Sequence, residues 1–183
     1  MYGGFNAIIS QLADKVGEPF KSFPAEATWY GLGGVSKWGT ICGALNGISF
    51  ATNLIVPQKD VEAICNEVIE WHNSTLLPTT ALDKYTGVPS KVRVVPGSPL
   101  CHISRSKFEA GKPSQAEIAE RCSKLTGDVA AKAVEVLNAY FSGKFVPTFK
   151  VSDEVNNCKR CHPGPKAYGM MDCTPCHGDH TKK

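Results

Sequence analysis

Two copies of the pattern C-x-x-C-H lie within twenty residues of each other near the end of the chain, at 158–162 and 173–177. This pattern is the attachment site of c-type haem: two cysteines form thioether bonds to one porphyrin, and the following histidine faces the iron. Covalent bonds hold such a cofactor, so the segment around it needs little core of its own. The motifs therefore predict two haem c groups per chain, held by thioethers and proximal iron ligands at Cys158, Cys161, His162, Cys173, Cys176 and His177.

A zinc ribbon is the competing interpretation, because two C-x-x-C pairs can also hold one zinc ion through four thiolates. The interval between Cys161 and Cys173 is close to the interval that such ribbons use. A four-cysteine site does not require a histidine directly after each pair, however. The histidines that follow both pairs therefore favour haem.

Charge and hydropathy exclude two classes of partner. The formal net charge of the 183 residues is +3 and the basic residues do not gather into a stripe, so nucleic acid is not expected as a partner. No apolar run approaches the roughly 18–20 residues that cross a bilayer, so no membrane span is expected. Haem is attached to C-x-x-C-H outside the bacterial cytoplasmic membrane. The first residues do not resemble a signal peptide, so we expect a mature periplasmic form whose signal peptide has been cleaved.

Apolar residues recur at three- and four-residue steps over four stretches, which is typical of helices that bury one face. A capping box of Ser114 and Glu117 opens the last stretch, and Cys122 is expected on its buried face. The apolar period stops after residue 149. The predicted helices lie at about 4–17, 35–55, 57–72 and 114–143. The predicted fold class is mainly α, with a helical N-terminal domain of about four helices over 1–149 and an irregular haem-binding C-terminal tail over 150–183.

Small residues follow one another along the predicted helix at 35–55, among them Gly39, Gly43 and Gly47. A glycine inside a helix costs about 1 kcal/mol relative to alanine, so these positions need a reason. Two reasons remain open at this point. Either another helix packs tightly against this one, or a cofactor approaches its backbone beside Cys42.

Four cysteines lie outside the haem motifs: Cys42, Cys65, Cys101 and Cys122. In an exported protein the usual fate of cysteines is a disulfide, and buried free thiols are the next alternative. Their spacing fits no single-loop iron–sulfur motif. Disulfides, free thiols and a metal site therefore all stay open on spacing alone.

The residues around three of these cysteines carry a family resemblance. The blocks at 38–47 (WGTICGALNG), 98–104 (SPLCHIS) and 121–128 (RCSKLTGD) resemble the cysteine blocks of the C-GCAxxG-C-C redox family. With the two C-terminal haem motifs, the chain resembles the split-Soret cytochromes c of sulfate-reducing bacteria. The resemblance implies a helical domain with a cysteine-bound iron–sulfur centre, for which we expect the 2Fe–2S type. It also implies a homodimer that gathers the haems of both subunits, and it makes Cys42, Cys101 and Cys122 candidate cluster ligands.

One cysteine of the family pattern is missing from this chain. It precedes a phenylalanine near the start of the first helix, and with Phe5 as that phenylalanine it would fall just before Met1. Either the chain is truncated at this end or Cys65 serves instead. Cys65 is therefore the fourth candidate ligand.

Three histidines remain for the distal side of the haem irons: His180, His102 and His72, in that order of preference. The resemblance implies bis-histidine haems with ligands shared between subunits, so two of the three are expected to bind iron. Six-coordinate haems carry electrons and leave no site for a substrate. The sequence therefore predicts a periplasmic di-haem cytochrome that passes electrons between an iron–sulfur centre and a stacked haem pair, to redox partners it does not identify, rather than an enzyme. The alternative function is a reductase of a small nitrogen or sulfur oxyanion at an open haem iron.

Overall fold

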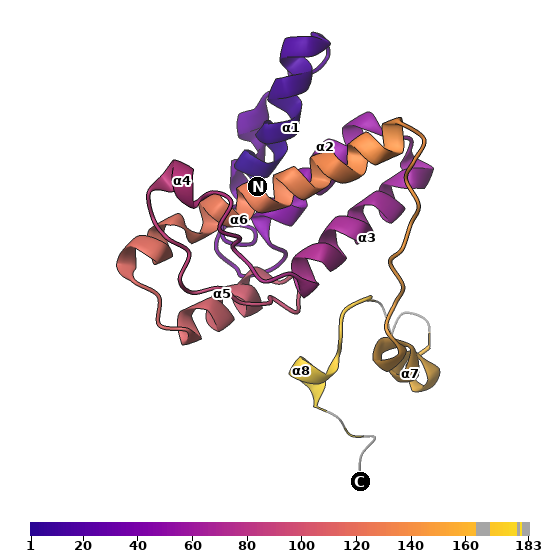
Figure 1. Cartoon of the computed structure of the whole chain (residues 1–183). Helices are drawn as coiled ribbons and strands as arrows, with labels where there is room; N and C mark the ends of the chain where they lie inside the picture. Colours follow the sequence, from indigo (N-terminus) through magenta and orange to yellow (C-terminus); the bar gives the residue numbers. More distant parts are fainter. Residues whose placement is uncertain (164–168, 179, 181–183) are drawn as a thin grey trace. The chain divides into compact units, whose positions relative to one another are not determined.

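The chain divides into two units, Met1–Pro147 and Thr148–Lys183, in a computed structural model that describes residues 1–163, 169–178 and 180 (Figure 1). The sequence placed its division after residue 149. The described residues form helices and contain no strand, only isolated bridges between Ile41 and Leu100 and between Leu77 and Val94. The predicted mainly α fold is therefore confirmed.

The first unit contains more helices than the four predicted. Two short ones, α4 and α5, and a 3-10 helix, η1, were not expected from the sequence. The elements of this unit are α1 (Tyr2–Lys15), η1 (Ala25–Gly31), α2 (Gly43–Ile55), α3 (Gln58–Ser74), α4 (Asp83–Thr86), α5 (Cys101–Ala110) and α6 (Gln115–Phe141).

The core of the first unit forms where α1, α2, α3 and α6 pack against one another. In Figure 1, α2, α3 and α6 run side by side, and α1 packs against α2 and α6 at a steep angle to them. Each helix contributes apolar residues at the three- and four-residue steps seen in the sequence. The most deeply buried of them are Phe5, Ile9, Leu45, Ile48, Ile64, Val68, Leu125 and Val129.

Glycines on both helices allow α1 and the residue before it to approach the backbone of α2 closely. A Cβ atom at Gly4 would lie 2.9 Å from the Ala44 carbonyl oxygen, and one at Gly47 would lie 2.9 Å from the Phe5 amide nitrogen. A Cβ atom at Gly43 would lie 2.7 Å from the Met1 amino nitrogen. Close packing of another helix therefore explains these small residues, and it brings the chain's first residue to the N-terminal end of α2.

The predicted helix at 35–55 begins later than expected, at Gly43. Residues 33–37 instead have φ angles between 49° and 71°, in the left-handed region. Such angles cannot continue a right-handed helix, and they are costly for residues with a Cβ atom. Backbone hydrogen bonds from Ser36 to Tyr30 and from Gly39 to Gly33 hold this segment. Trp38 is consequently 84% exposed instead of lying on an apolar helix face.

Helix α6 begins at the predicted capping box, in which the Ser114 hydroxyl accepts from the Glu117 amide and the Glu117 carboxylate accepts from the Ser114 amide. The prediction for Cys122 is wrong, since this residue is exposed. The neighbouring Arg121 and Lys124 are buried instead. The helix can bury these cations because neighbouring segments supply polar partners for them.

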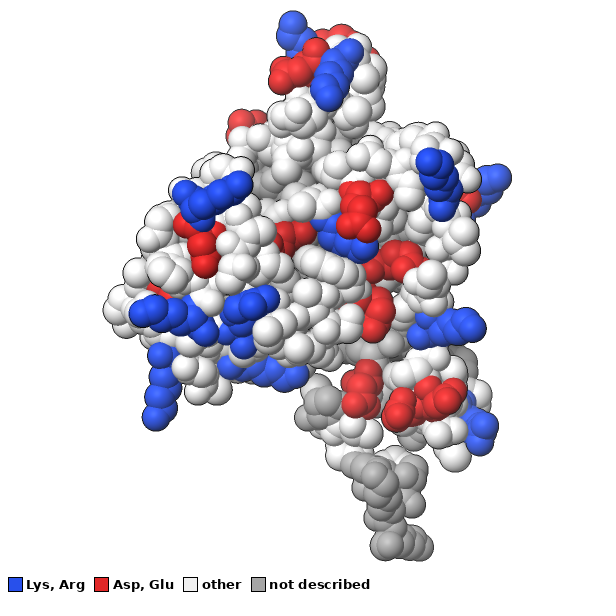
Figure 2. All heavy atoms as spheres, in the orientation of Figure 1, with Lys and Arg blue, Asp and Glu red and all other residues white. Residues whose placement is uncertain are grey.

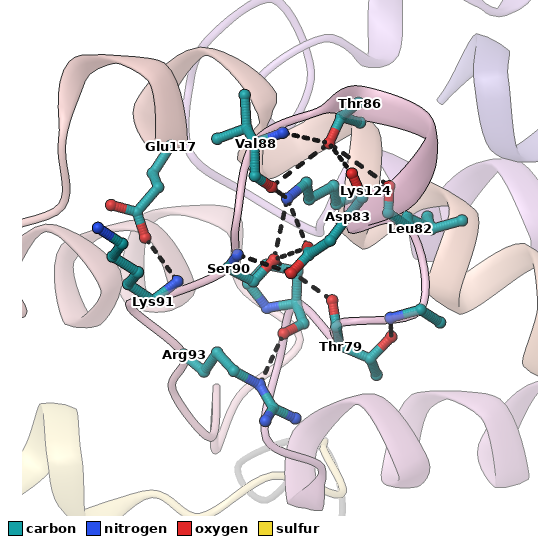
Figure 3. A network of polar contacts seen from close by, with 12 residues as sticks. Thr79, Leu82, Asp83, Thr86, Val88, Ser90, Lys91, Arg93, Glu117 and Lys124 are labelled. Atoms are coloured by element: carbon teal, nitrogen blue, oxygen red, sulfur yellow. Dashed lines mark hydrogen bonds and ion pairs between the residues drawn. The ribbon is translucent and has the colours of Figure 1, made fainter.

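One set of those partners lies in the proline-rich segment that precedes α5 (Figure 3). The Lys124 ammonium donates to Asp83 at 2.7 Å, to the Ser90 hydroxyl at 3.0 Å and to the Val88 carbonyl. The Glu117 carboxylate accepts from the amides of Lys91 at 2.9 Å and Val92 at 2.8 Å. These bonds fasten residues 83–92, which lie between the predicted helices at 57–72 and 114–143, to α6.

The second unit contains α7 (Asp153–Cys161) and α8 (Thr174–His177) among its described residues. The sequence predicted an irregular tail here, so both helices are additions. Across the chain, no described helix combines the length and apolar character needed to traverse a bilayer. Basic and acidic side chains are interspersed over the face of the molecule seen in Figure 2.

Candidate functional site

The first C-x-x-C-H motif occupies the last turn of α7. The helix opens with Ser152, whose hydroxyl accepts from the Val155 amide at 3.3 Å. Asp153 and Glu154 lie in its first turn and Lys159 and Arg160 in its last, an arrangement that favours the helix dipole at both ends. The motif's own basic residues therefore stabilise the C-terminal end of this helix.

The second motif forms α8 and repeats the same local geometry. The amide of His177 donates to the Cys173 carbonyl at 2.9 Å, and the amide of His162 donates to the Cys158 carbonyl at 3.0 Å. In each motif, therefore, one helical turn joins the first cysteine to the histidine. Residues three apart on a turn lie on the same face, so the two sulfurs of each motif point to one side. This is the arrangement that thioether bonds to the two vinyl groups of one porphyrin require.

The four motif cysteines do not converge on one point. Among the described residues, no group of three or more His, Cys, Asp or Glu side chains is gathered closely enough to hold a metal ion. A zinc ribbon needs four thiolates around one zinc ion. The described geometry is that of two C-x-x-C-H turns, each closed by its own backbone hydrogen bond.

His180 lies beside the histidine of the first motif. The ring centres of His162 and His180 are 5.9 Å apart and their planes are inclined by 69°. Two imidazoles on opposite sides of one metal ion have ring centres roughly 6 Å apart, because metal–nitrogen bonds are about 2 Å long. The structure thus places His180, the preferred candidate for a distal ligand, beside His162 of the first motif.

The two other candidate histidines belong to the first unit. His102 is exposed in the first turn of α5, and its amide donates to the Gly39 carbonyl at 3.1 Å. His72 is completely buried in the last turn of α3, where its Nδ1 lies 3.0 Å from the Asn73 side-chain oxygen. Burial lowers the pKa of His72, and its Nε2 has no hydrogen-bond partner. His72 is therefore a neutral imidazole with an open ring nitrogen.

A backbone bridge joins Cys42 to Cys101. The amide of Cys42 donates to the Pro99 carbonyl at 2.8 Å and the amide of Cys101 donates to the Thr40 carbonyl at 2.7 Å, on either side of the bridge between Ile41 and Leu100. Each cysteine then stands at a helix N-terminus, Cys42 as the residue before α2 and Cys101 as the first residue of α5. This bridge brings together two blocks that lie far apart in the sequence.

Cys122 and the chain's first residue complete this neighbourhood. The thiols of Cys42, Cys101 and Cys122 all act electrostatically on the Met1 amino group. Burial lowers the pKa of that amino group, while the three thiols oppose the shift. The amino group of Met1 is therefore close enough to all three cysteines to be affected by their charge. We call Cys42, Cys101 and Cys122 the cysteine group.

The thiols of the cysteine group are in unequal surroundings. Burial raises the pKa of Cys42, although the Ala44 and Leu45 amides at the start of α2 favour its thiolate. Burial also raises the pKa of Cys101, and the neighbouring thiols of the group raise it further. Cys122 is exposed beside the Arg105 guanidinium. The site thus runs from a buried sulfur to a solvent-exposed one.

Cys65 does not join this group. It is buried on α3, where burial raises its pKa and the Ser49 hydroxyl opposes that shift. None of the other cysteines contributes to its electrostatic surroundings. The structure therefore separates the alternative fourth ligand from the three that the family resemblance selects.

Thiolates are the ligands that iron–sulfur centres use, so the donors of the cysteine group have the right chemistry. Their side chains are neighbours but are not closed around one point. A buried hydrogen-bond donor, the Nε of Arg121, has no partner beside them. Sequence reasoning missed Arg121, although its position four residues before Leu125 and seven before Asp128 places it on the buried face of α6.

Comparisons with known proteins agree with this geometry. Residues 4–136 match the family described as "Putative redox-active protein (C_GCAxxG_C_C)". The chain is 37% identical over 188 residues to split-Soret cytochrome c of Desulfovibrio desulfuricans, covering 96% of this chain and 67% of that protein.

The fold matches a solved structure as well. Split-Soret cytochrome c from Desulfovibrio desulfuricans ATCC 27774, described with a novel iron centre, superposes with a TM-score of 0.85 and 36% identity. The match covers 100% of this chain and 81% of that one. The resemblance predicted from the cysteine blocks is confirmed, and the chain has a redox or electron-transfer role.

Proposed function

This chain belongs to the C_GCAxxG_C_C family of redox-active proteins and is related to split-Soret cytochrome c, and on that premise we propose that it is a di-haem electron-transfer cytochrome of the periplasm. The observation that carries the proposal is that both C-x-x-C-H motifs fold into the same kind of helical turn. A backbone hydrogen bond from the histidine to the first cysteine closes each turn, at 3.0 Å in the first motif and 2.9 Å in the second. With haem bound, each turn would supply two sulfurs and one imidazole to a single porphyrin.

Each C-x-x-C-H motif of the tail would hold one haem. Cys158 and Cys161 would bind one porphyrin and Cys173 and Cys176 the other, with His162 and His177 as proximal ligands. Haem supplies an iron that changes between ferric and ferrous states. The separation of 5.9 Å between the rings of His162 and His180 supports His180 as the distal ligand on the first motif. An iron held between two imidazoles has no open position, which favours electron transfer over catalysis.

The cysteine group is proposed as the second redox centre. The solved relative is described with an iron centre, and Cys42, Cys101 and Cys122 supply three soft sulfur donors that lie near one another in the first unit. We expect iron bound by these thiolates, in a centre of the 2Fe–2S type, with a fourth ligand other than Cys65. A homodimer that gathers the haems of two subunits completes the proposal, and His102 and His72 are the remaining candidates for the second haem.

The test is the cofactor content of protein purified without oxygen. We expect about two haems per chain in the pyridine haemochrome assay, low-spin ferric signals in the EPR spectrum and non-haem iron. Replacing Cys158 and Cys161 by serine should remove one haem, and replacing Cys173 and Cys176 should remove the other. Cys65→Ser serves as the matched control and should retain both haems and the iron.

A second variant tests the role of His180. His180→Ala should convert one haem to a high-spin form that binds cyanide, while the wild type does not bind it. Zinc without haem in the purified protein would refute the proposal. A wild-type high-spin haem that shifts with nitrite or sulfite would instead favour the reductase.

A further inference from the structure

Arg121 is a buried cation without a buried anion among its contacts. Its side chain is 3% exposed. Its Nη2 donates to the Ser104 carbonyl at 3.1 Å and to the Ser104 hydroxyl at 2.6 Å, and its guanidinium lies 5.1 Å from the centre of the Phe108 ring. Neither partner is charged. Among the described parts of the chain, no carboxylate lies within ion-pair distance of it, and its Nε has no partner.

The same helix handles its other buried cation differently. Lys124, one turn further along α6, forms an ion pair with Asp83 at 2.7 Å. Burying an unpaired charge is strongly unfavourable, so native proteins supply a counter-charge or avoid the burial. The burial of Arg121 therefore indicates that a negatively charged group lies beside it in the functional protein.

The surroundings of Arg121 identify that group. Its contact residue Ser104 lies three residues after Cys101 on α5, so the guanidinium lies within one helical turn of this cysteine. Arg121 directly precedes Cys122 in sequence, and its charge favours the thiolate forms of Cys42 and Cys101. Arg121 also acts on His72, which cannot become negative.

We propose that Arg121 is the internal counter-charge of the cysteine group, which therefore works as an anionic thiolate site for a metal centre and not as a disulfide. A disulfide is neutral and would leave the guanidinium uncompensated. Thiolates bound to iron would supply the negatively charged partner that the Arg121 guanidinium lacks. The Nε–H of Arg121 is available to donate a hydrogen bond to sulfur. The inference deepens the proposed function, because it rests on the iron centre assigned there to these cysteines.

A fixed positive charge also changes the balance between the two redox states. One-electron reduction of such a centre, with dithionite as the electron donor, would add a negative charge to it and would convert one ferric ion to ferrous. Arg121 stabilises this more negative state most strongly because it is buried, where charges are poorly screened. Arg105, which lies beside Cys122 but is accessible to solvent, should have a weaker effect.

The experiment compares full-length holoprotein of the wild type, Arg121→Gln, Arg121→Lys and Arg105→Gln in a dithionite titration followed by EPR. At a fixed potential, Arg121→Gln should lower the ratio of reduced to oxidised centre at least tenfold, about 59 mV for a one-electron couple. Arg121→Lys should retain most of the wild-type ratio, and Arg105→Gln should change it less than threefold. Equal potentials in the wild type and Arg121→Gln would overturn the proposal.

A second measurement does not depend on whether the variants fold. Mass spectrometry of wild-type protein, alkylated after acid release of metal, should find Cys42 and Cys101 as alkylated thiols. A Cys42–Cys101 disulfide in protein purified without oxygen would overturn the inference. Absence of non-haem iron in the wild type would refute the iron centre alone. In that case, recovery of Cys42 and Cys101 as alkylated thiols would still support a thiolate site beside Arg121, and a disulfide between them would overturn it.

Discussion

Gly47→Ala tests whether the close approach of α1 to α2 stabilises the fold. A Cβ atom at this position would lie 2.9 Å from the Phe5 amide nitrogen and closer still to the Met1 carbonyl oxygen. Ordinary contacts of a Cβ atom lie at 3.4–4 Å. Both obstructing atoms belong to the backbone, so neither can turn aside as a side-chain end would, and the first turn of α1 must retreat.

Two opposing effects set the size of the change. Alanine favours the helix by about 1 kcal/mol relative to glycine. Overpacking costs about 1–3 kcal/mol, and the completely buried Phe5 moves with the displaced turn, which favours the upper end of that range. We expect a net loss of about 1–2 kcal/mol. The thermal midpoint of a chain of this size should fall by about 2–8 °C.

Thermal unfolding followed by far-ultraviolet circular dichroism measures this change. Gly3→Ala is the matched control in α1, because its Cβ atom would meet only the end of the Thr126 side chain, at 3.3 Å, which can move. The control should unfold at the wild-type temperature or slightly above it. A Gly47→Ala protein at least as stable as the wild type would refute the role of close packing.

Two further predictions concern the bonds that fasten residues 83–92 to α6. The amides of Val92 and Ser114 are the main cause that lowers the pKa of Glu117 from 4.5 to about 2, so its contribution to stability is complete above pH 4.5 and is lost as the pH falls toward 2. Glu117→Gln should therefore lower the urea midpoint at pH 7 and match the wild type near pH 2, and a difference independent of pH would contradict this. Lys124→Met removes the ammonium that bonds Asp83, Ser90 and Val88, and it should destabilise the fold by about 2 kcal/mol and speed hydrogen exchange in residues 83–92. An unchanged urea midpoint would show that this buried ammonium adds nothing to stability.

Local patterns predicted those parts of the fold that local chemistry decides. The capping box opens α6 at Ser114 because the two residues satisfy each other's free groups without help from the rest of the chain. Phe5, Ile8 and Ile9 recur at helical steps, and they form the buried face of α1. The C-x-x-C-H motifs are equally local, and each folds into one turn.

The sequence failed where distant segments decide the outcome. The apolar period through 35–42 suggested a helix, but bonds to Tyr30 and Gly33 hold a left-handed segment there. The exposure of Cys122 follows from α6 burying Arg121 and Lys124, whose partners lie on segments that no local pattern connects to the helix. Helix α5 buries only Ser104 and Phe108, so its sequence carried little periodic signal.

The candidate site divided in the same way. The resemblance to known cysteine blocks selected Cys42, Cys101 and Cys122, and the structure brings these residues together while Cys65 lies apart. Spacing alone left a disulfide, free thiols and a metal site open, because it says nothing about which distant charges surround a thiol. Iron binding by the cysteine group and haem binding by the C-x-x-C-H motifs both stay predictions.

The bridge between Ile41 and Leu100 has a consequence for the order in which the protein matures. It closes a loop of roughly 60 residues, whose entropy must be lost before Cys42 and Cys101 become neighbours. The cysteine group therefore exists only after α2, α5 and α6 have assembled. Each C-x-x-C-H motif, by contrast, spans five residues and can be modified on an unfolded chain. We expect haem attachment to precede folding of the first unit and the iron centre to be inserted afterwards.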